Sequence, residues 1–173
     1  MIKKLFLLSI LLLAGCMGIP QGVTVVDDFS LDRFLGTWYE VARIDNSFEK
    51  NLGQVSASYK LAEDWSVTVL NKGYDAQKRE LQTIEGRGVF VGDIHKGALK
   101  VSFFGPFYAS YNVIALDKSG YRWAMVCGRD KAFFWILSRE PQMDPQLLKE
   151  LVFRAKSLGF DTEHLHYLYK KQP

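Results

Sequence analysis

The sequence contains few cysteines and no large excess of charge of either sign. Only two cysteines stand among its 173 residues, so a scaffold held by several disulfides is excluded. Its 22 lysines and arginines nearly balance its 19 aspartates and glutamates, which leaves a formal net charge of +3. Proteins that bind nucleic acid electrostatically carry a clear basic patch or excess. We therefore expect no nucleic-acid partner.

The sequence also has no apolar run long enough for a membrane-spanning helix, which needs about 20 such residues. The longest run, residues 5–13, is interrupted by Ser9 and preceded by Lys3 and Lys4. A short apolar run behind a basic start is typical of a secretory signal peptide. The run ends in Leu13-Ala14-Gly15-Cys16, which resembles the lipobox of bacterial lipoproteins.

This resemblance implies that residues 1–15 are removed and that Cys16 is acylated. Several acyl chains on one cysteine anchor a protein stably, because each buried methylene contributes about 0.8 kcal/mol. Met17 is not the aspartate that retains bacterial lipoproteins in the inner membrane, so the resemblance implies a lipid-anchored protein on the outer membrane, facing the periplasm. Residues 16–28 would form the lipidated tether. The alternative is an ordinary cleaved signal with a chance cysteine.

The remainder of the chain reads mainly as β-structure. Residues 29–34, with Ser30 as a possible N-cap, predict one helical turn before Gly36. Short runs rich in β-branched and aromatic residues follow, separated by turn signals such as 117–120 and 128–131. Consecutive strands with short connections predict an antiparallel sandwich or closed barrel. The eight expected strands are 37–44, 55–61, 66–72, 81–91, 98–104, 109–116, 121–127 and 133–138.

One amphipathic helix is expected after the strands. Asp144 is a suitable N-cap, Pro145 suits the first helical position, and Gly159 suits the end. An apolar stripe between them repeats with a period near 3.6 residues. Because the opposite face is polar, this helix should pack against the outside of the sheet. Residues 166–170 are expected to be extended.

Two motifs resemble those of the lipocalins. Gly36-Thr37-Trp38-Tyr39 follows the helical turn, as the G-x-W signature does in that family, and Trp135-Ile136-Leu137-Ser138-Arg139 ends the eighth strand with an arginine. The middle motif is present only in degraded form, as Leu116-Asp117-Lys118. The resemblance is strongest to the bacterial lipocalins. It implies an all-β domain over residues 29–173: an eight-stranded antiparallel up-and-down barrel with one C-terminal helix packed outside.

Gly36, Trp38 and Arg139 are assigned structural roles by this resemblance. Trp38 would close the floor of the barrel, and Arg139 would place its guanidinium over the indole in a cation–π contact. The remaining donors of Arg139 could bond carbonyl groups of the N-terminal turn. The alternative role for Arg139 is that of an anion ligand.

An eight-stranded barrel is just wide enough to hold a small ligand. Strand alternation, aligned on the lipocalin pattern, predicts which side chains face the lumen. Gly86 and Gly88 on one inner face, with Ala57 opposite, favour a void over a filled core. The predicted ligand-binding residues are Ala57, Tyr59, Val69, Asn71, Phe90, Val101, Phe103, Tyr111, Val113 and Trp135.

The resemblance implies a lipid-like ligand, either a fatty acid or a lysophospholipid, with a role in envelope transport, maintenance or stress. No cofactor and no metal site are expected, because His164-x-His166 has no third ligand nearby. Phe104 and Phe107 flank a Gly-Pro turn and could serve packing, membrane contact or a dimer contact. A homodimer therefore remains open.

The alternatives to a binding protein are an enzyme that uses Cys127 and a purely structural lipoprotein. Some lipocalins are enzymes with a cysteine nucleophile inside the barrel, which makes Cys127 a candidate for lipid chemistry. A nucleophilic thiol needs a base or a positive partner, and the sequence places no histidine beside Cys127. The pattern also points Cys127 outward, so we expect a binding protein and no enzyme. The other alternative is a structural envelope lipoprotein with a filled barrel.

Overall fold

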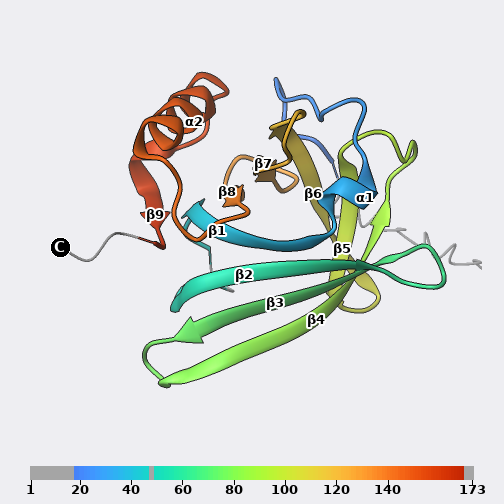
Figure 1. Cartoon of the computed structure of the whole chain (residues 1–173), viewed down its shortest axis with the longest axis horizontal. Helices are drawn as coiled ribbons and strands as arrows, with labels where there is room; N and C mark the ends of the chain where they lie inside the picture. Colours follow the sequence, from blue (N-terminus) through green and yellow to red (C-terminus); the bar gives the residue numbers. More distant parts are fainter. Residues whose placement is uncertain (1–17, 47–48, 170–173) are drawn as a thin grey trace, which may run out of the picture.

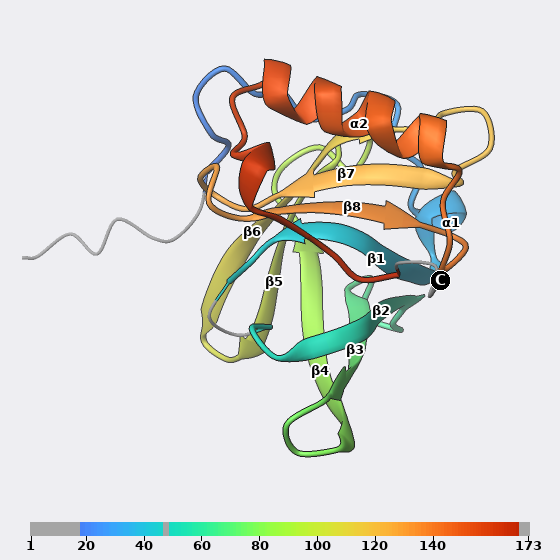
Figure 2. The same ribbon diagram turned by 90° about the vertical axis from the view of Figure 1, so that its left-hand side faces the viewer.

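The computed structural model describes residues 18–46 and 49–169, which form an antiparallel barrel with a helix against its outer wall (Figures 1 and 2). The predicted signal peptide and Cys16 lie outside the described residues. In this part of the chain eight consecutive strands pair each with the next, and the first closes the barrel by pairing with both the second and the eighth. The barrel strands are β1 (Gly36–Ile44), β2 (Leu52–Leu61), β3 (Val67–Asp75), β4 (Glu80–Phe90), β5 (Ala98–Phe104), β6 (Phe107–Leu116), β7 (Trp123–Cys127) and β8 (Phe134–Ser138).

The β1 strand changes partners along its length. Its first residues, Gly36 to Tyr39, pair with β2, whereas its last residues pair with the short strand β9 (Leu165–Tyr167). The register of β1 against β8 shifts between Glu40 and Ala42, which marks a β-bulge. A bulge adds one residue to a strand and so changes the alternation of inward and outward side chains. Because of this shift, the side chain of Arg43 points into the barrel.

The predicted helix is present as α2 (Pro145–Ser157). Asp144 caps it, because its side chain accepts a hydrogen bond from the backbone N–H of Leu147. The apolar face, including Leu151 and Ala155, packs on the outer wall of the barrel (Figure 2). The wall supplies a separate apolar cluster, made of the outward-facing side chains Val41, Ala42, Ile44, Ile114, Ala115, Met125, Cys127, Phe134 and Ile136.

Residues 18–29, which we call the N-terminal strap, lie against the barrel. Gly18 bonds to Ser110 and Asn112 of β6. Further along, the Val26 backbone bonds to Val113 and Gly97, and the Phe29 N–H donates to the His95 carbonyl. The described part of the expected tether is thus tied to the wall along its length. It leads into α1 (Leu31–Phe34).

Several boundaries differ from the prediction. Tyr121 was expected in a strand but lies in the preceding turn, with φ at 52° and its N–H donated to the Asp117 carbonyl. Ser30 precedes α1 without making a side-chain cap. A 3-10 turn, η1 (Thr162–His164), comes before β9, which ends earlier than the extended segment expected there. Within residues 18–46 and 49–169, no helix is long and apolar enough to cross a membrane.

Candidate ligand-binding calyx

The interior of the barrel has two distinct ends. Strands β1, β3, β5 and β7 run away from α1, so their far ends and the loops after them form one rim, which we call the mouth. The opposite end, the floor, is formed by α1, the 117–122 loop and Arg139. In Figure 2 the β5–β6 and β7–β8 loops of the mouth lie at the left, the β3–β4 turn lies at the bottom, and α1 lies at the right. The mouth loops join β1 to β2, β3 to β4, β5 to β6 and β7 to β8.

The ten side chains predicted to bind ligand all face this interior. Nine of them belong to one apolar cluster with Trp38 and Leu137, which draws residues from all eight strands. The tenth, Asn71, pairs with Ala57 in the β2–β3 ladder and therefore shares its face. The buried members are Ala57, Tyr59, Val69, Val101 and Val113, and the partly buried members are Phe90, Phe103, Tyr111 and Trp135.

Trp38 and Arg139 seal the floor. Trp38 is fully buried, stacks on Phe34 at 4.8 Å between ring centroids, and donates its indole N–H to the Phe34 carbonyl. The Arg139 guanidinium carbon lies 3.9 Å from the Trp38 ring. Its N–H groups donate to the carbonyls of Tyr121, Thr37 and Arg33, which joins β1, α1 and the 117–122 loop.

Gly36 suits this floor for two reasons. Its φ of +92° is readily adopted only by glycine. A Cβ atom at this position would also lie 3.3 Å from the Arg139 Nη1, tighter than ordinary van der Waals contact. The glycine of the motif therefore lets the chain turn beneath the arginine.

The degraded middle motif still organises the floor. Burial alone would raise the pKa of Asp117, but hydrogen bonds from Arg122, Ser119 and the Gly120 N–H outweigh it and lower that pKa far below its usual value. Asp117 is thus ionised and holds the loop closed. Arg33 lies over the Tyr121 ring at 4.1 Å and donates to two carbonyls of the same loop.

Two tyrosines form a polar pair within the apolar interior. The hydroxyl oxygens of Tyr59 and Tyr111 lie 2.8 Å apart, and the Tyr59 ring packs against Phe34 at the floor. Burial raises the pKa of both hydroxyls, so each remains protonated at neutral pH. Because one hydroxyl donates to the other, one proton stays available to a ligand.

Asn71 provides a second polar contact. Its Oδ1 is buried and has no hydrogen-bond partner among the described residues. A buried acceptor without a partner is costly, typically by about 1–3 kcal/mol. This atom can therefore accept a hydrogen bond from a hydroxyl or ammonium group inside the calyx.

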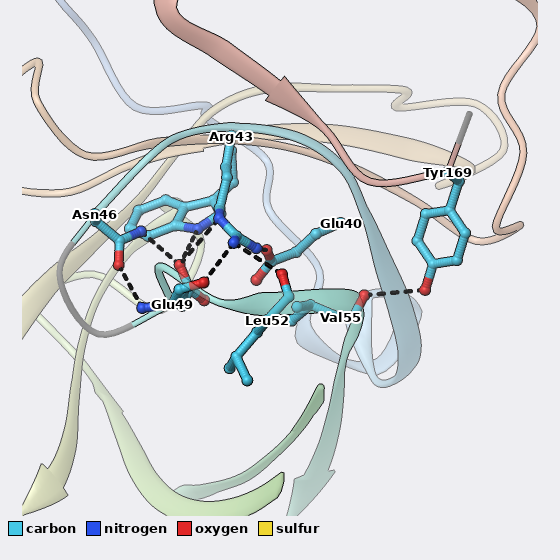
Figure 3. Close-up of polar contacts among 8 residues, drawn as sticks. Glu40, Arg43, Asn46, Glu49, Leu52, Val55 and Tyr169 are labelled. Atoms are coloured by element: carbon cyan, nitrogen blue, oxygen red, sulfur yellow. Dashed lines mark hydrogen bonds and ion pairs between the residues drawn. The ribbon is translucent and has the colours of Figure 1, made fainter. Parts of the chain in front are cut away.

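A buried charge cluster near the mouth was not predicted from the sequence. Arg43 is fully buried, pairs with Glu40, and donates to the backbone carbonyls of Glu49 and Leu52 (Figure 3). The Glu49 carboxylate accepts from Asn46 and from the Trp135 indole. These contacts tie the β1–β2 loop to the barrel interior. They also occupy the indole N–H of Trp135, one of the predicted ligand-binding residues.

The bulge in β1 explains why both charges point inward. Glu40 pairs with Leu137, and Arg43 pairs with Trp135, and both partners belong to the interior cluster. Regular alternation would place residues 40 and 43 on opposite faces. The inward Trp38 of the motif does predict an inward Glu40, because the two residues lie two positions apart in the same strand. The inward Arg43 depends on the bulge, which the sequence does not mark.

The space above Gly86 is not a void. A Cβ atom built on Gly86 would lie 2.7 Å from the Phe103 ring, so that ring occupies the space the glycine leaves. Phe103, Tyr111 and Trp135 nonetheless remain partly exposed although they face inward.

Cys127 lies outside this interior, in the cluster beneath α2. It is fully buried, and burial raises the pKa of its thiol to about 12. The thiol is therefore protonated at neutral pH, which is unfavourable for a nucleophile. His164 pairs with Asp161 at 2.7 Å, and no group of metal-binding side chains occurs within the described ranges.

A closed eight-stranded barrel with an inward tryptophan at its floor, an arginine stacked on it and an apolar interior is the architecture of a lipocalin. The chain belongs to this family: the lipocalin-like domain matches residues 28–170. It is 45% identical to the outer membrane lipoprotein Blc of Vibrio cholerae, over 98% of this chain and 99% of that protein. Identity to Blc of Escherichia coli is 47%, covering 89% and 85%.

More distant relatives share the fold. Apolipoprotein D of Rattus norvegicus is 31% identical, over 79% of this chain and 75% of that protein. Among solved structures, insecticyanin from the tobacco hornworm Manduca sexta superimposes with a TM-score of 0.71 at 21% identity, covering 90% and 88% of the two chains. This structural likeness shows the fold alone.

Proposed function

We propose that this protein is a membrane-anchored lipocalin that binds a single-chain lipid, either a fatty acid or a lysophospholipid, in the bacterial envelope. The observation that carries the proposal is the lining of the barrel, which is apolar and includes inward-facing aromatic side chains that are only partly buried. Ligand sites of this kind combine apolar lining with a few placed polar groups. The relatives named as outer membrane lipoproteins support the location.

The lining suits an amphipathic molecule. An acyl chain between Val101, Val113 and Phe90 would be stabilised by about 25 cal/mol for each Å² of apolar surface removed from water. The polar head would stay toward the mouth, because an unpaired polar group in the dry interior is costly. Asn71 Oδ1 accepts hydrogen bonds, so it favours a head group with a hydroxyl or ammonium donor. A lysophospholipid supplies such donors.

The membrane anchor in this proposal is Cys16, acylated after removal of residues 1–15. The 98% coverage of this chain in the alignment with a protein named as a lipoprotein supports it. Replacing Cys16 by Ser should release the protein from outer-membrane fractions. If the variant still fractionates with outer membranes, the anchor is elsewhere.

A role without catalysis forms part of the proposal. The candidate nucleophile Cys127 lies on the outer wall and has a raised thiol pKa. Cys127→Ser should therefore leave lipid binding intact and remove no turnover. A bound lipid recovered as a cleaved or isomerised product, in a manner dependent on Cys127, would contradict this.

The direct test is to identify the bound lipid. Residues 16–173 with Cys16→Ser can be secreted behind an ordinary signal peptide, purified without detergent, extracted with solvent and examined by mass spectrometry. We expect one single-chain lipid per protein. Val113→Asp, which places a charge in mid-lumen, is the matched control and should carry none while remaining folded by circular dichroism. Equal lipid in both proteins would indicate adsorption outside the barrel.

A further inference from the structure

Two aromatic side chains stand exposed at the mouth. Phe104 ends β5 and Phe107 begins β6, and they are 73% and 79% exposed. They flank the Gly105-Pro106 turn, and we call these four residues the β5–β6 tip. Neither side chain contributes to the interior cluster or to the cluster beneath α2. Neighbouring exposed apolar side chains on a protein surface mark an interaction site.

The described chain begins beside this same hairpin. The Gly18 N–H donates to the Ser110 hydroxyl at 2.8 Å, and Ser110 lies on β6 three residues after Phe107. The side chain of Asn112 donates to the carbonyls of both Gly18 and Gly128. Gly128 starts the loop between β7 and β8, which is itself part of the mouth (Figure 2). The N-terminal strap therefore starts at the mouth end of the barrel wall.

Chain geometry then limits how far the anchor can lie from the mouth. Cys16 precedes Gly18 by two residues, which span at most about 7 Å when fully extended. Ser110 lies about 10 Å along the strand from Phe107, at roughly 3.3 Å per residue. An acyl-bearing Cys16 therefore keeps the β5–β6 tip and the β7–β8 loop of the mouth within reach of the bilayer.

We propose that the mouth of the calyx docks on the membrane surface, with Phe104 and Phe107 inserted at the boundary between head groups and acyl chains. This inference rests on the acylation of Cys16 proposed above. Aromatic side chains favour that boundary region. In this orientation the calyx opens toward the bilayer, so a single-chain lipid can pass between membrane and protein with little exposure to water.

The charges of the mouth fit the same partner. The exposed charged side chains on the described parts of its loops comprise four cations and three anions, a small positive excess that is compatible with anionic head groups. Tyr74 and Leu81, cross-strand neighbours near the β3–β4 turn, add a second exposed apolar pair at this end. The cations are Lys50, Lys78, Arg79 and Arg129, and the anions are Asp45, Glu80 and Asp130, the last paired with Arg129 at 3.4 Å.

The floor end supplies a matched control. Trp65 and Ile94 are 81% and 59% exposed there, in the β2–β3 and β4–β5 connections. They are comparable to the two phenylalanines in apolar character and exposure. Trp65 lies in the β2–β3 connection, at the opposite end of the barrel from the β5–β6 tip. Ile94 lies in a connection whose His95 and Gly97 bond to the strap, so Trp65 alone serves as the control. The proposal therefore predicts opposite behaviour for two chemically similar surfaces.

The first experiment locates each end relative to the bilayer. Phe107→Cys or Trp65→Cys is introduced in a Cys127→Ser background, and the acylated full chain is labelled with an environment-sensitive fluorophore. Each protein is reconstituted into vesicles of phosphatidylethanolamine and phosphatidylglycerol with or without nitroxide-labelled lipid. We expect a blue-shifted label at position 107 that nitroxide lipids quench, and a water-exposed, unquenched label at position 65.

Two outcomes would overturn the proposal. One is a water-exposed label at position 107 or a quenched label at position 65. The other is a label at position 107 that is shielded from water but not quenched by nitroxide lipids. That result would show that protein, such as a second copy of this chain, covers the β5–β6 tip instead of lipid.

The second experiment tests lipid passage. Phe104→Ser/Phe107→Ser should slow the transfer of a fluorescent lysophospholipid from vesicles to the acylated protein several-fold. Trp65→Ser should leave the rate unchanged, and equal slowing in both variants would overturn the proposal. Equilibrium affinity measured without vesicles should be the same in all three proteins. If none of them binds the lipid, the proposed function fails, while the labelling experiment still determines the orientation.

Discussion

Arg43 and Glu40 form an ion pair inside the barrel, with Nη1 and Oε2 3.2 Å apart and both side chains buried. Burial raises the pKa of Glu40 well above its usual value, and the nearby Glu49 raises it further, while Arg43 lowers it. The arginine thus only partly offsets the loss of water around the Glu40 carboxyl group. A buried charge cluster of this kind makes stability sensitive to pH and to the loss of any member.

The first prediction concerns that pH dependence. A raised folded-state pKa means that Glu40 contributes stability below its unfolded pKa, near 4.5, and that this contribution is lost as the pH rises through the folded value. Glu40→Gln mimics the protonated carboxyl group and removes this loss. We expect the variant to resemble the parent protein near pH 4.5 and to exceed it in unfolding free energy at pH 8. Urea titrations at several pH values measure the difference; parallel profiles would contradict it.

Removing Arg43 should be far more damaging. Arg43→Met leaves Glu49 and Glu40 without their buried cation and two backbone carbonyls without their donor. Breaking a buried ion pair by removing one partner typically costs about 3–5 kcal/mol. Arg154→Met, on the exposed face of α2, is the control and should change stability by no more than about 0.5 kcal/mol. Similar urea midpoints for the two variants would show that the cluster contributes little.

Arg139 should matter for the fold and not for the ligand. Arg139→Ala removes the contact with Trp38 and leaves three carbonyl groups without a donor, for an expected loss of about 2–4 kcal/mol. Arg139→Lys should recover only part of this, because an ammonium lacks the planar fork of the guanidinium. Affinity per folded molecule should change little. A large loss of affinity with an unchanged Tm would instead place Arg139 in the ligand site.

A chain-length series tests the depth of the calyx. The affinity for single-chain lipids should rise with acyl length until the tail reaches Trp38 and Tyr59 at the floor, and fall beyond that length. Each additional buried methylene is worth about 0.8 kcal/mol, so the rising part should be steep. Isothermal titration of saturated chains against residues 16–173 with Cys16→Ser gives the slope. Affinity that does not vary with length would favour a filled barrel with lipid adsorbed outside.

The barrel strands and α2 could be predicted because their signals are local. Strand alternation, turn residues and the helix cap at Asp144 each depend on residues close in sequence, and the structure confirms the fold class. Strand alternation, aligned on the lipocalin pattern, also placed all ten predicted lumen side chains on the inner face. Whether those side chains bind ligand stays a prediction.

The missed features depend on contacts between distant segments. The bulge in β1 turns Arg43 inward, where Glu49 of the following loop meets it, and neither residue carries a sequence signal for burial. The Phe103 ring fills the space left by Gly86 on the neighbouring strand, so a pair of glycines alone does not indicate a void. Similarly, Tyr121 leaves its strand because Asp117 organises the turn before it.

The position of Cys127 makes the thiol a natural reporter of helix detachment. It is the free cysteine of the described chain, and α2 and the wall together exclude water from it. A thiol reagent can reach it only when α2 lifts away or the barrel unfolds. The rate of modification, measured against denaturant concentration, therefore separates partial opening from global unfolding. The same coverage would protect a single unpaired thiol from oxidation in a compartment that favours disulfides.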